Sequence, residues 1–130
     1  MIGGKEKMRN TNVRVSEEVR IKLEEYRIKK GLHKNKVTIS QIAGQIVSNW
    51  LKDPFELKEY IEAEKKSKVI RSTNVTVSLK DDDKAKLYEI FAEKYIKEVV
   101  SVNVLLYVIL VEFMDNNYED FDIKKVFSEV

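Results

Sequence analysis

The sequence predicts a mainly α-helical protein with one two-stranded antiparallel β-ribbon, made by two strand–helix–helix modules that form an intramolecular pseudo-dimer. A duplicated hexapeptide carries this prediction: residues 11–16 (TNVRVS) return as residues 73–78 (TNVTVS), with Thr76 in the place of Arg14. Both copies alternate polar and apolar residues, which is the period of a strand with one buried face. A charged amphipathic stretch and then a more apolar one follow each copy, and a period of about sixty residues is typical of a duplicated small module.

Pairing between the two strands follows from what a single module lacks. One strand has two open edges, and two helices in roughly forty residues form too small a core to fold alone. The second copy can supply the missing strand. We therefore expect the strands of the two copies to pair with each other.

The alternation gives each strand a core face and an outward face. The core face consists of valines: Val13, Val15, Val75 and Val77. The outward face consists of polar residues: Asn10, Asn12 and Arg14 in the first strand, and Ser72, Asn74 and Thr76 in the second. These outward residues are the candidate binding residues of the chain.

The first module is predicted to span residues 8–53. Ser16, which two glutamates follow, predicts the N-cap of a first helix, and Gly31 predicts the end of that helix. Thr38 is the predicted N-cap of a second helix. One apolar face follows it at helical spacing: Ile39, Ile42, Ala43, Ile46, Val47 and Trp50.

A helical connector is predicted at residues 54–70, followed by the second module at 71–115 and a C-terminal tail at 116–130, all within one compact domain. Ser78 and the acidic run at residues 81–83 repeat the helix start of the first module. The apolar face predicted for this helix consists of Leu87, Tyr88, Phe91, Ala92, Tyr95 and Val99.

Ser101 predicts the N-cap of the last helix, and register with the first copy favours a helix over residues 102–114. This stretch is apolar almost all round, so we expect the helix to be buried on every side. Either the apolar residues of the tail cover it or another chain does. The tail residues concerned are Phe121, Ile123, Val126 and Phe127.

Composition indicates a folded protein and excludes several kinds of site. Of the 130 residues, 43% are hydrophobic and 35% are charged, which is typical of a globular chain. The absence of cysteine excludes disulfides and thiolate ligands, and the single histidine, His33, leaves no histidine metal cluster. We therefore expect no catalytic residues, no metal and no cofactor, and we predict that the protein is not an enzyme.

The segment around the N-terminus lacks the apolar core of a signal peptide. The longest apolar run, Val104–Val111, is shorter than the roughly 20 residues that span a bilayer. We therefore expect a cytoplasmic protein, in the interior of a host cell, with no membrane partner.

Charge is distributed unevenly along the chain. Residues 1–52 contain twelve Lys or Arg and five Glu, a net +7, whereas residues 71–130 contain eight Lys or Arg and twelve Asp or Glu, a net −4. A basic half joined to an acidic half indicates a polyanionic partner on one side. Ordinary surface charge in a lysine-rich proteome would give the same pattern.

Four segments together resemble the Arc- and MetJ-like ribbon-helix-helix family of DNA-binding regulators. They are residues 10–14 with 38–40, and residues 72–76 with 101–103, and the resemblance covers about residues 9–52 and 71–114. Members of this family form intertwined dimers whose two strands make an antiparallel ribbon that enters the major groove. Two copies in one chain resemble the tandem members, which include conjugation accessory proteins similar to TraY and regulators from viruses of hyperthermophilic archaea.

The resemblance implies two sets of DNA contacts. Base edges would be read by the outward strand residues, with asparagine suited to adenine and arginine suited to guanine: Asn10, Asn12, Arg14, Ser72, Asn74 and Thr76. Phosphates would be held by residues before the first strand and at the starts of the second helices: Arg9, Lys34, Lys36, Thr38, Ile39, Ser101 and Val102. The second copy departs from the pattern by lacking the arginine and the turn lysines, so we expect DNA to be gripped unequally.

These observations predict a sequence-specific double-stranded DNA-binding transcriptional regulator of a virus or plasmid, a repressor or an activator. The abundance of lysine and glutamate with few glutamines favours a thermophilic archaeal source. Self-association on DNA, through the helices or the C-terminal segment, is expected. Two alternatives stay open: a relaxosome accessory protein of a conjugative element, and a protein–protein assembly scaffold that uses the apolar last helix.

Overall fold

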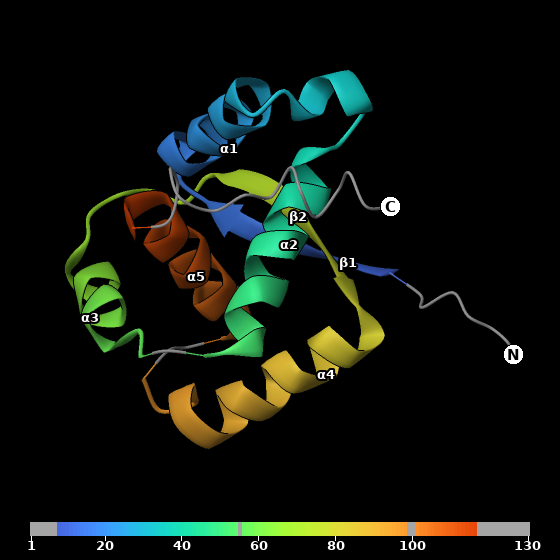
Figure 1. Cartoon of the computed structure of the whole chain (residues 1–130). Helices are drawn as coiled ribbons and strands as arrows, with labels where there is room; N and C mark the ends of the chain where they lie inside the picture. The colour runs from blue at the N-terminus through green and yellow to red at the C-terminus, as the bar shows by residue number, and fades with distance from the viewer. Residues whose placement is uncertain (1–7, 55, 99–100, 117–130) are drawn as a thin grey trace, which may run out of the picture.

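The computed structural model describes residues 8–54, 56–98 and 101–116 (Figure 1). Its elements in chain order are β1 (Met8–Val15), α1 (Glu17–Lys29), the 3-10 helix η1 (Leu32–Asn35), α2 (Ile39–Lys52), α3 (Lys58–Lys66), β2 (Thr73–Lys80), α4 (Asp81–Ile90), the π-helical η2 (Phe91–Tyr95) and α5 (Val102–Asn116). Most of the described residues are helical, and the two strands form one antiparallel sheet. The predicted fold class, mainly α with a two-stranded antiparallel ribbon, is confirmed.

The register of the ribbon centres on the duplicated hexapeptide. Val13 of β1 lies opposite Val75 of β2, which is the same residue of the second copy. Asn12 lies opposite Thr76, and Arg14 lies opposite Asn74. Since Asn74 and Thr76 are the second-copy equivalents of Asn12 and Arg14, the pairing on one side of the central valines repeats on the other with the strands interchanged. This is the register that a twofold relation between the two strands requires. The four valines predicted to face the core are all buried.

The second helix of each module packs on the strand of the other module: α2 lies on β2, and α5 lies on β1. Ser40 Oγ in α2 donates a hydrogen bond to the backbone oxygen of Thr76 at 2.9 Å. At the opposite edge, Asn103 Nδ2 in α5 donates to the backbone oxygen of Asn12 at 2.6 Å, and Asn103 Oδ1 accepts from the N–H of Arg14 at 3.1 Å. These side chains satisfy backbone groups at both edges of the ribbon, where another strand could otherwise add.

The contact between α2 and β2 is close enough to require glycine at one position of the helix. A Cβ built on Gly44 would lie 1.8 Å from the backbone oxygen of Ser78. Six residues after its own N-cap, α5 carries Tyr107 where α2 carries Gly44, and Tyr107 is buried as well. The two helices therefore carry very different side chains at the corresponding position.

Most helix ends follow the predicted signals. Ser16, Thr38 and Ser101 each accept a hydrogen bond from the backbone N–H three residues later, and such a cap typically stabilises a helix by about 1 kcal/mol. Thr38 forms a full capping box with Gln41. Gly31 follows the C-cap of α1 with φ 71°, the left-handed conformation that glycine adopts without strain.

The start of α4 corrects one prediction. Ser78 does not open a helix, because β2 continues to Lys80, which is the N-cap residue of α4. Ser78 pairs instead with Asn10 of β1, and Leu79 is buried. Burial of this leucine continues the valine alternation on the core face, and β2 extends three residues beyond Val77, the equivalent of the last residue of β1.

The described part of the predicted connector contains the helix α3, which the buried side chains of Leu57 and Ile61 hold to the core. The first helix of the second module differs from expectation. In the predicted apolar face after β2, Leu87 and Tyr95 are buried, but Tyr88 is exposed. Ala92 is exposed and Phe91 half-buried, while Val99 lies outside the described residues. From Phe91 onward, the π-helical turn η2 breaks the 3.6-residue spacing that the prediction assumed.

Helix α5 occupies the centre of the molecule, in contact with β1, α1, α2 and α3 (Figure 1). Residues 105–110 and 112–114 are buried, which confirms the expected burial of this helix. The predicted cover by Phe121, Ile123, Val126 and Phe127 falls outside the described residues. Among the helices that the structure describes, none combines the length and the apolarity needed to cross a bilayer.

Candidate nucleic-acid interface

The ribbon turns one face of polar side chains away from the core. Three cross-strand pairs form it: Asn10 with Ser78, Asn12 with Thr76, and Arg14 with Asn74. Asn10, Asn12, Arg14 and Asn74 are exposed, and Thr76 and Ser78 are half-exposed. Five of the six predicted base-contact residues therefore lie together on one surface, which we call the ribbon face.

Ser72 does not lie in the ribbon as predicted, and Ser78 lies there instead. Ser72 is exposed but lies one residue before β2, outside the paired ladder. Ser78 was missed, although it lies directly across from Asn10. Its place follows from the register, because a ladder centred on Val13 and Val75 puts residue 78 opposite residue 10.

The central pairs of the ribbon face differ in chemistry. Thr76 Oγ1 donates a hydrogen bond to Asn12 Oδ1 at 3.0 Å, which fixes the asparagine amide across the ribbon. The second lone pair of that oxygen and the Nδ2 group can still bind a base edge. In the neighbouring pair, Arg14 offers the planar donor fork that recognises two acceptors at once, and Asn74 offers an amide.

The N-termini of α2 and α5 lie at the two edges of the ribbon, as the bonds from Ser40 and Asn103 show. The first N–H groups of a helix have no partner inside that helix, so Ile39 and Val102 at the first helical positions present donors suited to phosphate. Thr38 uses its own N–H for the capping box, at 2.8 Å from Gln41 Oε1. Its contribution to a phosphate contact is therefore the positioning of the helix start.

The predicted basic phosphate contacts occupy different surroundings. Lys34 and Lys36 are exposed, in and just after η1, beside the N-terminus of α2. His33, interpreted as a polar turn residue, is exposed in the same turn. Arg9 Nε instead donates to Asp81 Oδ1 at 2.8 Å, so the first turn of α4 partly neutralises this arginine.

The structure adds Arg71, which the sequence reasoning missed. Arg71 lines an open hollow of about 520 Å³ together with Arg14, Ser101 and Asn103. Its guanidinium is held by Glu64, at 3.3 Å, and by the Tyr107 ring, at 5.5 Å from the ring centroid. The repeat itself was the available signal, because the spacing of 62 residues that relates Asn12 to Asn74 relates Arg9 to Arg71.

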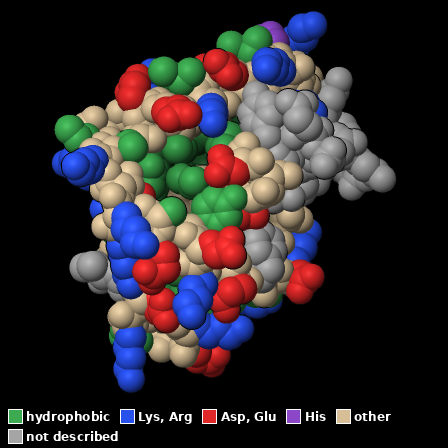
Figure 2. All heavy atoms as spheres, turned by 90° about the vertical axis from the view of Figure 1, so that its left-hand side faces the viewer, with side chains coloured by type: hydrophobic (Ala, Val, Ile, Leu, Met, Phe, Trp, Pro, Cys, Tyr) green, Lys and Arg blue, Asp and Glu red, His purple; other side chains and the backbone are tan. Residues whose placement is uncertain are grey.

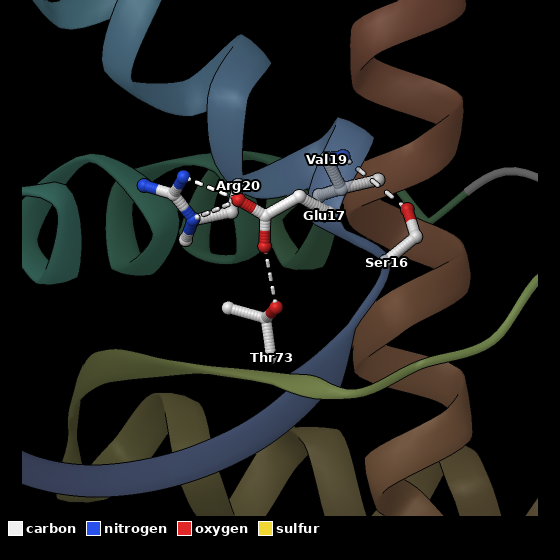
Figure 3. A network of polar contacts seen from close by, with 5 residues as sticks. All are labelled: Ser16, Glu17, Val19, Arg20 and Thr73. Carbon is white, nitrogen blue, oxygen red and sulfur yellow. Dashed lines mark hydrogen bonds and ion pairs between the residues drawn. The ribbon is translucent and has the colours of Figure 1, made fainter.

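A polar network joins the ribbon to α1 (Figure 3). Glu17 accepts hydrogen bonds from Arg20 Nε at 3.1 Å and from Thr73 Oγ1 at 2.7 Å. These bonds hold the pKa of the Glu17 carboxyl below its ordinary value, the arginine having the larger effect. Arg9 and Asp81 form the corresponding contact at the other end of the ribbon. In both contacts, an acidic residue in the first turn of a module's first helix bonds a side chain from the strand of the other module.

A second hollow lies away from the ribbon face, between α1, α3 and α5. It has a volume of about 260 Å³, with Tyr60, Tyr107, Val108 and Met114 in its wall. Figure 2 shows apolar side chains gathered there with acidic side chains around them, and Glu64 is among the lining residues. Burial raises the pKa of Glu64, an effect that Arg71 partly opposes. This acidic surrounding is unsuited to a nucleic acid.

No protein-family model, curated protein or solved structure matches this chain.

Proposed function

We propose that this chain is a sequence-specific double-stranded DNA-binding transcriptional regulator that inserts its β1–β2 ribbon into the major groove. The ribbon face carries the proposal: three cross-strand polar pairs point away from a core face of buried valines. A major groove about 12 Å wide admits a two-stranded ribbon, and asparagine and arginine have the donors and acceptors that distinguish adenine and guanine there.

The arrangement of the modules supports an intramolecular pseudo-dimer of ribbon-helix-helix modules. The register centres on Val13 and Val75, and each second helix packs on the strand of the other module. A DNA-reading ribbon of this kind assembles within one chain, so its formation does not depend on protein concentration.

Unequal halves are part of the proposal. The first copy contributes Arg14 together with the exposed lysines of η1, whereas the second contributes Thr76. We therefore expect a recognition sequence that is not palindromic, with a guanine contact in one half only.

The direct test selects tight binders from a pool of random duplexes with the full chain, at moderate salt and with excess competitor DNA. We expect one enriched sequence, bound at least about 10³-fold more tightly than unrelated duplex. The double variant Asn12→Ala/Arg14→Ala should lose this preference and keep its fold, because both side chains are exposed. Lys66→Ala, an exposed change at the end of α3, is the matched control.

Two results would contradict the proposal. One is the absence of any enriched sequence in the selection. The other is duplex binding that the double variant leaves unchanged at moderate salt. Either result would favour the assembly-scaffold alternative, in which the ribbon face contacts a protein.

A further inference from the structure

The hollow between α1, α3 and α5 has no part in the proposed DNA contacts. Its wall is mainly apolar, with buried side chains of α1 and α5 and the half-buried ring of one α3 residue: Val19, Tyr107, Val108, Met114 and Tyr60. Its volume of about 260 Å³ is slightly below the range of about 300–1,000 Å³ that is typical of small-molecule sites. A ligand of this cavity, which we call the α3 hollow, would therefore be small and would have an apolar body.

Acidic side chains surround the wall of the α3 hollow (Figure 2). The lining contains four charged residues: Glu18, Lys22, Glu64 and Asp115. Lys22 Nζ lies 3.2 Å from Glu18 Oε1, so these two charges offset each other within α1. The carboxylates of Glu64 and Asp115 remain, on α3 and α5. The hollow is therefore electronegative, which favours a cationic ligand.

The Tyr60 hydroxyl responds to this charge. Burial raises its pKa, and the nearby carboxylates of Asp115 and Glu112 raise it further, against a hydrogen bond from Asn116 that lowers it. A phenol loses its proton less readily where the resulting anion would meet negative charge. The shift therefore agrees with the charges of the lining.

Glu64 is the carboxylate best placed to recognise a cation. Its side chain is only 18% exposed, and Arg71 Nε contacts one of its oxygens at 3.3 Å. Burial nevertheless raises the pKa of Glu64, because the contact with Arg71 offsets this effect only in part. A carboxylate can accept about four hydrogen bonds, so a second cation can bind Glu64 from the hollow and stabilise its charge.

We propose that the α3 hollow binds a small organic ammonium ion, with its charged group at Glu64 and its apolar body against the wall. The rings of Tyr60 and Tyr107 add attraction for the cation. An anion of the same shape would be repelled by the two carboxylates. A neutral apolar molecule would bury Glu64 further without stabilising its charge.

One consequence rests on the proposed function: Arg71 couples the α3 hollow to the ribbon. Val69 lines both the α3 hollow and the open hollow at the ribbon edge, where Arg71 and Arg14 lie. An ammonium ion at Glu64 competes with Arg71, whose guanidinium can then contact a DNA phosphate at the ribbon edge. Ammonium and DNA should therefore strengthen each other's binding by the same factor.

The first test titrates the full chain, without DNA, with alkylammonium ions from methylammonium to hexylammonium, and follows the backbone amides by NMR. Affinity should rise with the length of the apolar body. The shifts should centre on residues of the α3 hollow. Hexanoate, which has a similar chain and the opposite charge, should not bind.

Variants locate the charged group. Glu64→Gln keeps the shape of the side chain and should weaken hexylammonium binding at least about tenfold. Glu59→Gln is the matched control, an exposed carboxylate on the same helix that does not line the hollow, and should change nothing. Arg71→Gln should tighten hexylammonium binding by removing its competitor, a result that a damaged fold would not give.

The second test measures the affinity for the selected duplex at constant ionic strength. Saturating hexylammonium should tighten binding by about fivefold or more, and Arg71→Gln should abolish this gain.

Other outcomes overturn the proposal. Failure of every ammonium ion to bind at millimolar concentration does so, as does hexylammonium binding that Glu64→Gln leaves unchanged. Equal binding of hexanoate would refute recognition of the charge. Ammonium binding without any change in duplex affinity would refute the coupling through Arg71 and leave the ligand site in force. Absence of duplex binding would refute the proposed function and leave the NMR result in force.

Discussion

The two modules repeat one order of elements but meet the ribbon differently. In the first, α2 approaches β2 at Gly44 so closely that no side chain fits between them. In the second, α5 carries Tyr107 at the corresponding position and bonds the edge of β1 through the amide of Asn103. The exposed strand residue that differs, Arg14 against Thr76, lies on the ribbon face between these contacts. The two halves therefore share the ribbon and differ in the packing behind it and in the side chains in front of it.

The largest expected effect comes from removing the close approach in the first module. Gly44→Ala should destabilise the protein by about 3 kcal/mol or more, because its Cβ would overlap a backbone oxygen that cannot move independently. Gly31→Ala is the matched control: no atom lies within 4 Å of its Cβ, and only its left-handed backbone costs about 1–2 kcal/mol. Urea unfolding of both variants measures the difference. Equal effects would show that the contact with Ser78 does not constrain α2.

The next effect compares the two strands on DNA. Arg14→Ala should weaken binding to the selected duplex by about 1–3 kcal/mol, whereas Thr76→Ala should cost less because its hydroxyl already bonds Asn12. Thr76→Arg should shift the selected sequence toward a more symmetric one. Fluorescence anisotropy titrations at fixed salt provide the affinities. Equal losses from the two alanine variants would refute the inequality of the halves.

A smaller effect compares the two edge contacts. Asn103→Ala removes two hydrogen bonds to β1 and should cost about 1–2 kcal/mol, and Ser40→Ala removes one bond to β2 and should cost about 1 kcal/mol. Hydrogen exchange should show faster opening of the Arg14 amide in the first variant. The exposed change Ser72→Ala should alter neither stability nor exchange.

The smallest effect concerns the ends of the ribbon and depends on pH. The pKa of Glu17 is lowered in the folded state, so its network stabilises the protein above the ordinary carboxyl pKa, and this stability is lost as the pH falls through the lowered value. Glu17→Gln should therefore lower the thermal midpoint at pH 7 and have little effect near pH 2. A midpoint difference that persists unchanged in acid would exclude this role for the carboxylate.

Local patterns were sufficient for most of the elements. Period-two alternation identified both strands, and Ser16, Thr38 and Ser101 identified three helix starts, because a cap depends only on residues three positions apart. Prediction failed where a distant contact overrides the local pattern. Leu79 extends β2 past Ser78 because its side chain is buried in the core, and the π-helical turn η2 breaks the 3.6-residue spacing assumed for the residues after Ile90.

The candidate site shows the same division. Five residues of the ribbon face followed from the alternation. Arg71 could have been found from the repeat, because 62 residues separate it from Arg9, whereas Ser78 could be placed only once the pairing of the strands was known.

The sequence by itself determined the duplication, the polar and core faces of the ribbon, the helix caps and the opposite charges of the two halves. These depend on spacing along the chain and on residue type. Only the tertiary structure decided the register centred on Val13 and Val75, the packing of each second helix on the other module's strand, and the need for glycine at position 44. The physical reason is that these features arise from contacts between segments more than thirty residues apart, where the shapes of both partners decide the distance.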